Sequence, residues 1–242
     1  MEYIQTFSLH EQKCMKKTAK SLKSTLRLNE EILNFYFNLI LKQSNDDTDI
    51  PLQDFSIMII HSKILKISTC LSTLLLKGNY CEFQSLQRDV FELHYLSEYL
   101  IKNPEKVDPW FEGESIKHSH VSKNLEIPLA MKQLYGMMCD YTHPNFNGIK
   151  GNLLLEHDDI VNFNTYPEFH KPTARALVVM QNVLLYSAMD LFFKQFKKFN
   201  NFNLEDEKQL KQIRSRLGKS SKAWIKYSYN PENEIFPMKV QM

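Results

Sequence analysis

The fold is decided by the stretch LQDFSIMIIHSKILKISTCLSTLLLKGNYCEFQSLQRDVFELHYLSEYLIK, residues 52–102. In its first half, apolar side chains recur every three or four positions, the spacing that gathers them on one face of an α-helix. This apolar stripe comprises Ile57, Ile60, Ile64, Ile67, Leu71 and Leu74. Pro51 suits the start of this helix and Gly78 its end. The stretch therefore predicts two successive long helices, residues 52–77 and 80–102.

The second of these helices has two unlike faces. At 100° per residue, one face is apolar and predicts core packing; it comprises Phe83, Leu86, Val90, Leu93, Leu100 and Ile101. The other face mixes charge with aromatic rings and comprises Gln84, Arg88, Phe91, Glu92, Tyr95 and Tyr99. A face that only meets solvent is usually polar throughout. We therefore treat this second face as the first candidate for a functional surface.

Helical periodicity continues along most of the remaining chain. It predicts one long or two successive helices at residues 8–42, and further helices at 127–142, 172–199 and 204–217. Gly218 marks the predicted end of the last one. Between residues 147 and 164 the helical period is lost, and two short apolar runs there favour a small β-hairpin.

These elements predict an all-α fold, a single helical bundle of long antiparallel helices with a small β-hairpin insertion. We divide the chain into an N-terminal helical region (1–50), a helical core (51–200) and a C-terminal helix with a basic, aromatic tail (201–242). Only 6 of the 242 residues are glycine, against an average of about 7%. There is no G-x-G-x-x-G or Walker loop, which excludes the common phosphate-cradling folds.

Charge, cysteines and hydropathy are those of an ordinary globular chain. The net charge is +2, so the chain as a whole is not strongly basic. The 4 cysteines are far apart with no C-x-x-C, and we expect them to be buried and reduced. No signal peptide is visible, and charged residues interrupt the most apolar stretch, residues 55–76. We expect a cytoplasmic protein with no membrane partner.

The first candidate for chemistry is the Arg88-x-x-x-Glu92 pair. Residues four apart share one side of a helix and can pair, so the two either form a structural ion pair or present Arg88 to an anionic ligand with Glu92 orienting it. His94 adds an R-x5-H spacing. Six residues along a helix place Arg88 and His94 about 120° apart, so they share a site only through a kink or a second protomer.

The second candidate is the segment DYTHPN, residues 140–145. Pro144 ends the preceding helix, and the helix dipole favours a protonated His143 at that end. Asp140 is positioned to orient the imidazole, and Asn145 follows with a donor and an acceptor. The alternative is a simple C-terminal cap. We also include Gln84, Tyr95 and Tyr141 as candidate binding residues.

The order of these features resembles bacterial all-helical families with a HEPN-like core. An apolar helix is followed by a helix with R-x-x-x-E and then by one that ends in Y-x-H-P, and RDVFELH at 88–94 matches the Arg-to-His spacing of HEPN ribonucleases. In those families the motif normally belongs to a late helix, whereas here it is in the middle of the chain. We therefore expect Arg88, Glu92 and His143 to line one pocket, with the R-x5-H spacing a coincidence.

The resemblance implies a bacterial phage-defence or toxin–antitoxin protein, a homodimer that acts as a metal-independent endoribonuclease without a cofactor. Histidine would take the 2′-hydroxyl proton of RNA, and arginine would stabilise the charge on phosphorus. An antitoxin or another defence protein is the implied partner.

Other functions fit the residues as well. One is a non-catalytic binding or regulatory module, in which the same residues hold a ligand or the bundle. Another is a subunit of a larger assembly, with Phe91, Tyr95, Tyr99 and Trp110 at its interface. His118-x-His120 has ligand-like spacing but no Glu or Cys partner at a recognised interval, so we expect no metal.

Two lysine clusters complete the candidates. They are Lys13, Lys16, Lys17, Lys20 and Lys23 near the N-terminus, and Lys194, Lys197 and Lys198. Each is either an ordinary solvated helix face or a surface for the RNA backbone.

Overall fold

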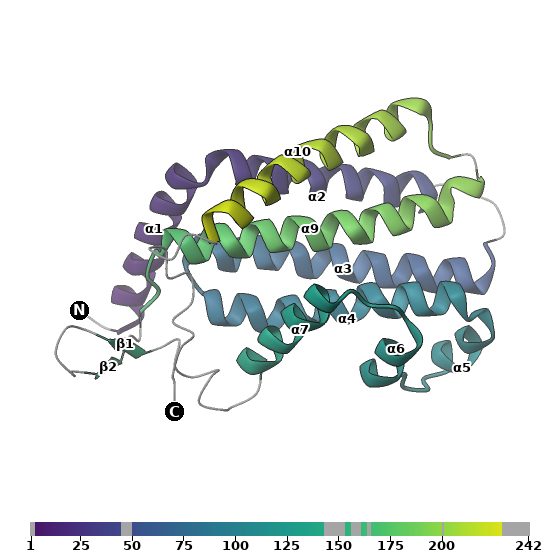
Figure 1. The fold of residues 1–242 in the computed structure, drawn as a ribbon, viewed down its shortest axis with the longest axis horizontal. Helices are drawn as coiled ribbons and strands as arrows, with labels where there is room; N and C mark the ends of the chain where they lie inside the picture. Colours follow the sequence, from purple (N-terminus) through teal and green to yellow (C-terminus); the bar gives the residue numbers. More distant parts are fainter. Residues whose placement is uncertain are drawn as a thin grey trace.

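The computed structural model describes residues 3–44, 50–142, 153–155, 161–163, 166–199 and 201–228. It is an all-α fold, as predicted (Figure 1). The long helices are α1 (Tyr3–Ser21), α2 (Lys23–Ser44), α3 (Leu52–Lys77), α4 (Tyr80–Lys102), α9 (Lys171–Phe196) and α10 (Leu204–Ser228). Shorter elements are η1 (Pro104–Lys106), α5 (Val107–Phe111), α6 (His118–Asn124), α7 (Leu129–Thr142) and η3 (Lys197–Phe199). Strands β1 (Leu153–Leu155) and β2 (Val161–Phe163) pair antiparallel.

The predicted pair of helices, α3 and α4, forms the centre of the molecule. The turn between them depends on Gly78, which has a φ of +84° and ends α3 in the left-handed conformation. A Cβ at this position would lie 3.0 Å from Sγ of Cys14 and 3.2 Å from the carbonyl oxygen of Glu168. Glycine is therefore required both by the dihedral angle and by the close approach of two other chain segments.

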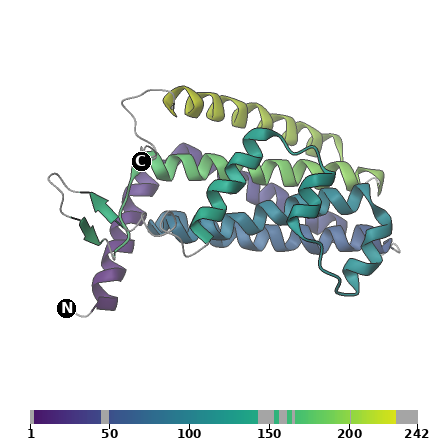
Figure 2. The same ribbon diagram turned by 60° about the horizontal axis from the view of Figure 1, so that its bottom comes forward.

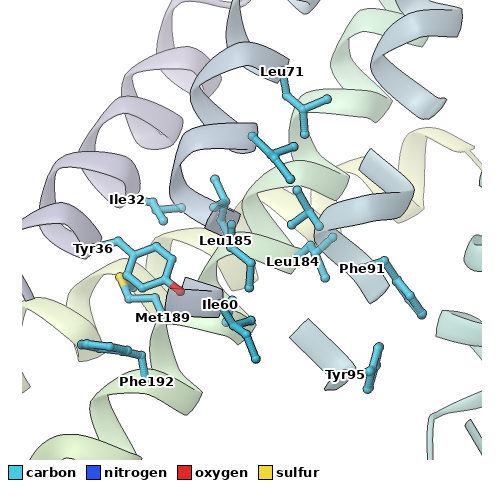
Figure 3. Packing of buried hydrophobic residues seen from close by; sticks show 14 of the residues in the cluster. Ile32, Tyr36, Ile60, Leu71, Phe91, Tyr95, Leu184, Leu185, Met189 and Phe192 are labelled. Atoms are coloured by element: carbon cyan, nitrogen blue, oxygen red, sulfur yellow. The ribbon is translucent and has the colours of Figure 1, made fainter. Parts of the chain in front are cut away.

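The core lies between α2, α3, α4 and α9. Figure 3 shows buried residues of the hydrophobic cluster, from α2 (Ile32, Tyr36), α3 (Ile60, Leu71), α4 (Phe91, Tyr95) and α9 (Leu184, Leu185, Met189, Phe192). Helix α10 packs on α2 and α9, while α6 and α7 pack on α4. Figure 1 shows α6 and α7 on the side of α4 that faces away from α2. Both predicted faces of α4 are thus covered, the aromatic face by α6 and α7.

Hydrogen bonds inside this core select one alignment of the helices. The fully buried imidazole of His61 is bonded through Nδ1 to the hydroxyl of Tyr36 and through Nε2, at 2.8 Å, to Oγ of Ser97. Nδ2 of Asn29 donates to Oδ1 of Asn182 at 2.7 Å. Because sliding one helix would leave these buried polar groups unpaired, they favour a single packing arrangement.

Of the two alternatives predicted for residues 8–42, the structure has two successive helices, which meet at Leu22. Two other sequence-based expectations differ from the structure. The predicted end at Gly218 is wrong, because α10 continues to Ser228. No proline occurs in residues 219–230, and a single glycine costs only about 1 kcal/mol inside a helix. The cysteines were expected to be buried, yet only Cys14 is; Cys70 is exposed, and the other two are half-buried.

Among the described helices, two are long and apolar enough to cross a membrane by length and composition alone. They are Leu52–Lys77 and Lys171–Phe199. The core helices of a soluble protein can pass the same test, and 39% and 67% of the residues in their most apolar windows are buried inside the bundle.

Candidate functional site

Arg88 and Glu92 form the ion pair that their spacing predicts. Nε of Arg88 donates to Oε1 of Glu92 at 2.7 Å, and both side chains are partly exposed. The same carboxylate oxygen accepts a bond of 2.6 Å from the hydroxyl of Tyr135 on α7. The guanidinium carbon of Arg88 lies 5.7 Å from the centre of the Tyr135 ring. We call these three residues the Arg88–Glu92–Tyr135 cluster; it ties α7 to α4.

The cluster has well-defined charges. Burial acts to raise the pKa of Glu92, but the hydrogen bonds from Tyr135 and Arg88 outweigh it, so the pKa is lowered. For Arg88, burial acts to lower the pKa, and the bond and charge of Glu92 raise it above its ordinary value. The pKa of Tyr135 is raised by burial and by the Glu92 carboxylate. Arg88 is therefore a cation, Glu92 an anion and Tyr135 neutral at neutral pH.

His118, at the start of α6, is the histidine that the fold brings to this cluster. Its ring centre lies 4.2 Å from that of Tyr135, and it meets Phe91 edge to face at 5.8 Å. Nδ1 is buried and has no hydrogen-bond partner among the described residues. Burial lowers the pKa of His118; the charge of Arg88 lowers it further, while that of Glu92 opposes the change. The imidazole is therefore neutral at pH 7 and able to accept a proton.

A pocket of about 690 Å³ opens beside His118 and Tyr135. Phe91, Leu125 and Ile127 supply its apolar surface, and Ser119, Ser122, Lys123, Glu126 and Lys132 supply polar groups. Both lysines are exposed. A second pocket of about 270 Å³ is lined by Glu92 and His118, together with Lys63 and Asp89. Arg88 lines neither pocket, so its contact with a ligand there would be indirect, through Glu92 and Tyr135.

His94 does not converge with Arg88 within one chain. Its Nε2 lies 3.0 Å from Oγ of Ser187 on α9, and the side chain is buried. Burial lowers the pKa of His94 to about 4. Arg88, in contrast, contacts Tyr135 on α7. The R-x5-H spacing therefore places the two side chains against different helices, as the 120° offset predicts.

The other predicted site residues fall into three groups. Gln84 and Tyr95 are buried on α4, and Tyr95 packs against Phe91 with ring centres 4.6 Å apart. Asp140 and Tyr141 belong to the last turn of α7, and the structure describes the backbone but not the side chain of either. His143 and Asn145 lie outside the described residues. The expectation that Arg88, Glu92 and His143 line one pocket thus stays a prediction.

The aromatic side chains of α4 pack inside the chain rather than at an interface. Phe91, Tyr95 and Tyr99 are all buried within the single chain. They therefore do not form the assembly interface that was one of the expectations. The Tyr99 hydroxyl lies 3.0 Å from Nε2 of His120, which gives His120 a structural partner. No group of three or more metal-ligating side chains gathers anywhere in the described part of the chain.

His118 and Tyr135 belong to the site but are not among the site residues predicted from the sequence. Both belong to segments that pack on α4 only in the tertiary structure. Their distance along the chain from Arg88 and Glu92 leaves no local spacing that could signal the contact. The aromatic face of α4 was the only hint in the sequence, because aromatic side chains on a helix indicate that another segment of the protein or a partner packs against them.

The described elements therefore define an all-α bundle with a basic and aromatic pocket between α4, α6 and α7. Comparison of the chain with protein-family models, with curated proteins and with solved structures found no match.

Proposed function

We propose that the protein is a helical module that binds RNA, with one nucleotide unit held in the pocket of about 690 Å³ beside His118 and Tyr135. The observation that carries the proposal is the pairing of two cationic side chains, Lys123 and Lys132, with aromatic rings in one pocket wall. Lysines attract a phosphate group. Histidine and tyrosine rings are surfaces on which an unstacked RNA base can pack.

The size and charge of the pocket agree with this ligand. Ligand pockets span about 300–1,000 Å³, a range that includes the observed volume. With His118 neutral, Lys123 and Lys132 outweigh Glu126, the single acidic residue among the described residues of the wall. The Glu126 carboxylate is suited to accept a hydrogen bond from the amino group of a base.

In this proposal the Arg88–Glu92–Tyr135 cluster positions the pocket. It fixes α7 on α4 and holds the Tyr135 ring beside His118. Arg88 is a positioning residue here, because its guanidinium is already bonded to Glu92 and it does not line the pocket.

The test is binding of nucleoside monophosphates and of a short single-stranded RNA to the purified full chain. We expect the K123Q/K132Q variant to lose at least tenfold in affinity. K106Q/K208Q, which removes the same charge from exposed lysines on η1 and α10, is the matched control and should bind like the wild type. Equal affinity of both double variants for every ligand would refute the proposal.

Metal-independent RNA cleavage is the second candidate, favoured by the neutral imidazole of His118 in the pocket wall, which makes no hydrogen bond to another described residue. The imidazole would take the proton of the 2′-hydroxyl, and the 2′-oxygen would attack the adjacent phosphorus. The bond from phosphorus to the 5′-oxygen would then break and leave a 2′,3′-cyclic phosphate, while the departing 5′-oxygen takes a proton from water and becomes a hydroxyl. Lys123 or Lys132 would offset the developing charge.

RNA incubated with the wild type, R88A, H118A and H143A in the presence of EDTA tests this second candidate. Cleavage that H118A abolishes while RNA binding persists would support it. Absence of cleavage by the wild type, or equal cleavage by all four proteins, would refute cleavage and leave RNA binding as the proposed function.

The resemblance to HEPN-like proteins extends the proposal to a cytoplasmic homodimer in bacterial phage defence or a toxin–antitoxin pair. Growth arrest on expression, relieved by R88A, tests that extension.

A further inference from the structure

A row of basic residues runs along α1 and the beginning of α2, away from the pocket residues on α6 and α7. We call it the basic stripe; it comprises Lys13, Lys16, Lys17, Lys20, Lys23 and Arg27. Successive members are one, three or four residues apart, and the four lysines of α1 fall within an arc of about 100° on the helix. All six residues are exposed, and none forms an ion pair with another described residue.

The acidic residues nearest to the stripe do not neutralise it. Glu11 is bonded to Lys77 and Asn79 on the other side of α1, at 3.2 Å in each case. Glu31 on α2 pairs with Arg216 of α10. The sequence between Glu11 and Glu30 contains no acidic residue. Among the described residues, no ion pair therefore neutralises the positive charges of the stripe.

The second lysine cluster, Lys194, Lys197 and Lys198, differs from the stripe in its ion pairs, although the two clusters have similar sequences. Lys194 pairs with Asp190 and Lys197 with Glu207, while the Lys198 ammonium lies 2.9 Å from a carboxylate oxygen of the buried Asp54. Each of these lysines thus has an acidic partner within the chain. The tertiary structure thus shows that the second cluster is neutralised by acidic partners, whereas the basic stripe is available to bind a partner.

The composition of the stripe favours a polyanion over a membrane surface. A helix that lies on a membrane presents an apolar face next to its basic face. In α1, Cys14 and Thr18 on the side turned away from the lysines are buried against the bundle. Four large apolar side chains of α1 are exposed, but at 100° per residue they are spread around the helix and do not form one face beside the lysines; they are Tyr3, Ile4, Leu9 and Met15. Both ribbon views place α1 at one end of the molecule, at an angle to α2 (Figures 1 and 2).

We propose that the basic stripe binds the sugar–phosphate backbone of an RNA strand without reading its sequence. The stripe is a row of cations without an ion-pair partner among the described residues, and the phosphates of a nucleic acid form a similar row of negative charges. Binding of the two gains free energy from the release of counterions. This inference rests on the proposed RNA binding but concerns a second surface. It predicts that the chain binds an RNA longer than the pocket requires.

Fluorescence anisotropy with a labelled 20-nucleotide single-stranded RNA, measured on the full chain over a range of salt concentrations, tests the stripe. The K13Q/K16Q/K17Q/K20Q variant removes four charges from exposed positions. If each lysine contacts one phosphate, the salt slope falls by about 3, at 0.7 per contact. We expect at least a tenfold loss of affinity at 0.1 M salt.

Two variants control this experiment. K13R/K16R/K17R/K20R keeps the charge and should bind like the wild type. K194Q/K197Q removes lysines that already have acidic partners, and it should leave the salt slope unchanged. An unchanged affinity and slope in the four-glutamine variant, or binding to phosphatidylserine vesicles but not to RNA, would overturn the proposal.

The stripe and the pocket can fail separately. Loss of binding in K123Q/K132Q with no effect of the four-glutamine variant would leave the pocket proposal standing and refute the stripe. The reverse result would refute the pocket and support the stripe. A mononucleotide should respond to the pocket variant only, because it is too short to follow the stripe.

Discussion

Tyr135 and Glu92 lie 43 residues apart in sequence, and the Tyr135 hydroxyl donates a hydrogen bond of 2.6 Å to Oε1 of Glu92. That oxygen also accepts the bond from Arg88. One carboxylate on α4 is thus shared between a cation on its own helix and a phenol on α7. The segment from α6 to α7 is held over the aromatic face of α4 by this bond together with the stacked rings of Phe91 and Tyr135.

Removing the Tyr135 hydroxyl should loosen α7. We expect Y135F to lower the free energy of unfolding by about 1 kcal/mol, since hydrogen bonds to charged groups contribute about 1.5–3 kcal/mol and this one is partly exposed. Urea unfolding of Y135F, E92Q and the double variant measures the coupling. Y186F is the control, because the half-buried Tyr186 makes no hydroxyl hydrogen bond that involves another described residue. Strict additivity of Y135F and E92Q would contradict the shared bond.

The buried histidines should make the protein less stable in mild acid. Burial lowers the pKa of His94 to about 4 and that of His61 well below its ordinary value. Between pH 6.5 and the folded pKa, the unfolded chain binds protons that the folded chain does not, so stability falls as the pH falls. By pH 5 the loss of stability due to His94 should be about 2 kcal/mol, and His61 should act in the same direction.

Urea unfolding of the wild type and H94Q between pH 7.5 and pH 5 measures the histidine effect. Glutamine can keep a hydrogen bond to Ser187 without titrating, so the stability of H94Q should depend less steeply on pH. Parallel curves for the two proteins would show that His94 does not resist protonation in the folded state.

The buried Asp54 should depend on Lys198. The Asp54 side chain is 1% exposed and accepts bonds from Lys198, at 2.9 and 3.0 Å, and from Gln195, at 2.7 Å. We expect K198Q to destabilise the protein by about 2 kcal/mol, because it leaves a buried carboxylate without its cation.

The same substitution in an exposed ion pair gives the loss of stability with which K198Q is compared. K194Q breaks the pair with Asp190, in which the lysine side chain is 70% exposed, and should change stability by less than about 0.5 kcal/mol. Thermal unfolding of both variants makes the comparison. A loss for K198Q no larger than that for K194Q would mean that the burial of Asp54 places no special demand on Lys198.

Gly78 should tolerate substitution less well than Gly113. Both have positive φ, +84° and +105°. A Cβ at Gly78 would press on Cys14 and on the Glu168 carbonyl, whereas one at Gly113 would meet open space. We expect G113A to cost about 1 kcal/mol from the dihedral strain alone and G78A at least about 2 kcal/mol. Chemical denaturation ranks the two, and a G113A loss equal to that of G78A would show that the contacts at Gly78 relax freely.

The sequence by itself determined the helices, because their signals are local. The apolar stripe of residues 52–77 places Ile57, Ile60 and Ile64 in the core, and the turn glycine at 78 ends α3 where predicted. Asn203 begins α10 by accepting bonds from the backbone amides of Glu205 and Asp206. The Arg88–Glu92 pair also follows from spacing alone, since residues four apart on a helix are neighbours.

Only the tertiary structure decided which groups meet between helices. His118 reaches Tyr135 and the cluster because α6 and α7 pack on the aromatic face of α4. Lys198 is neutralised by Asp54, 144 residues away, whereas Lys17 has no acidic partner among the described residues. Such contacts depend on how separate helices are oriented and aligned. Helical periodicity predicts which face of a helix is buried but not which residues of another helix lie against it.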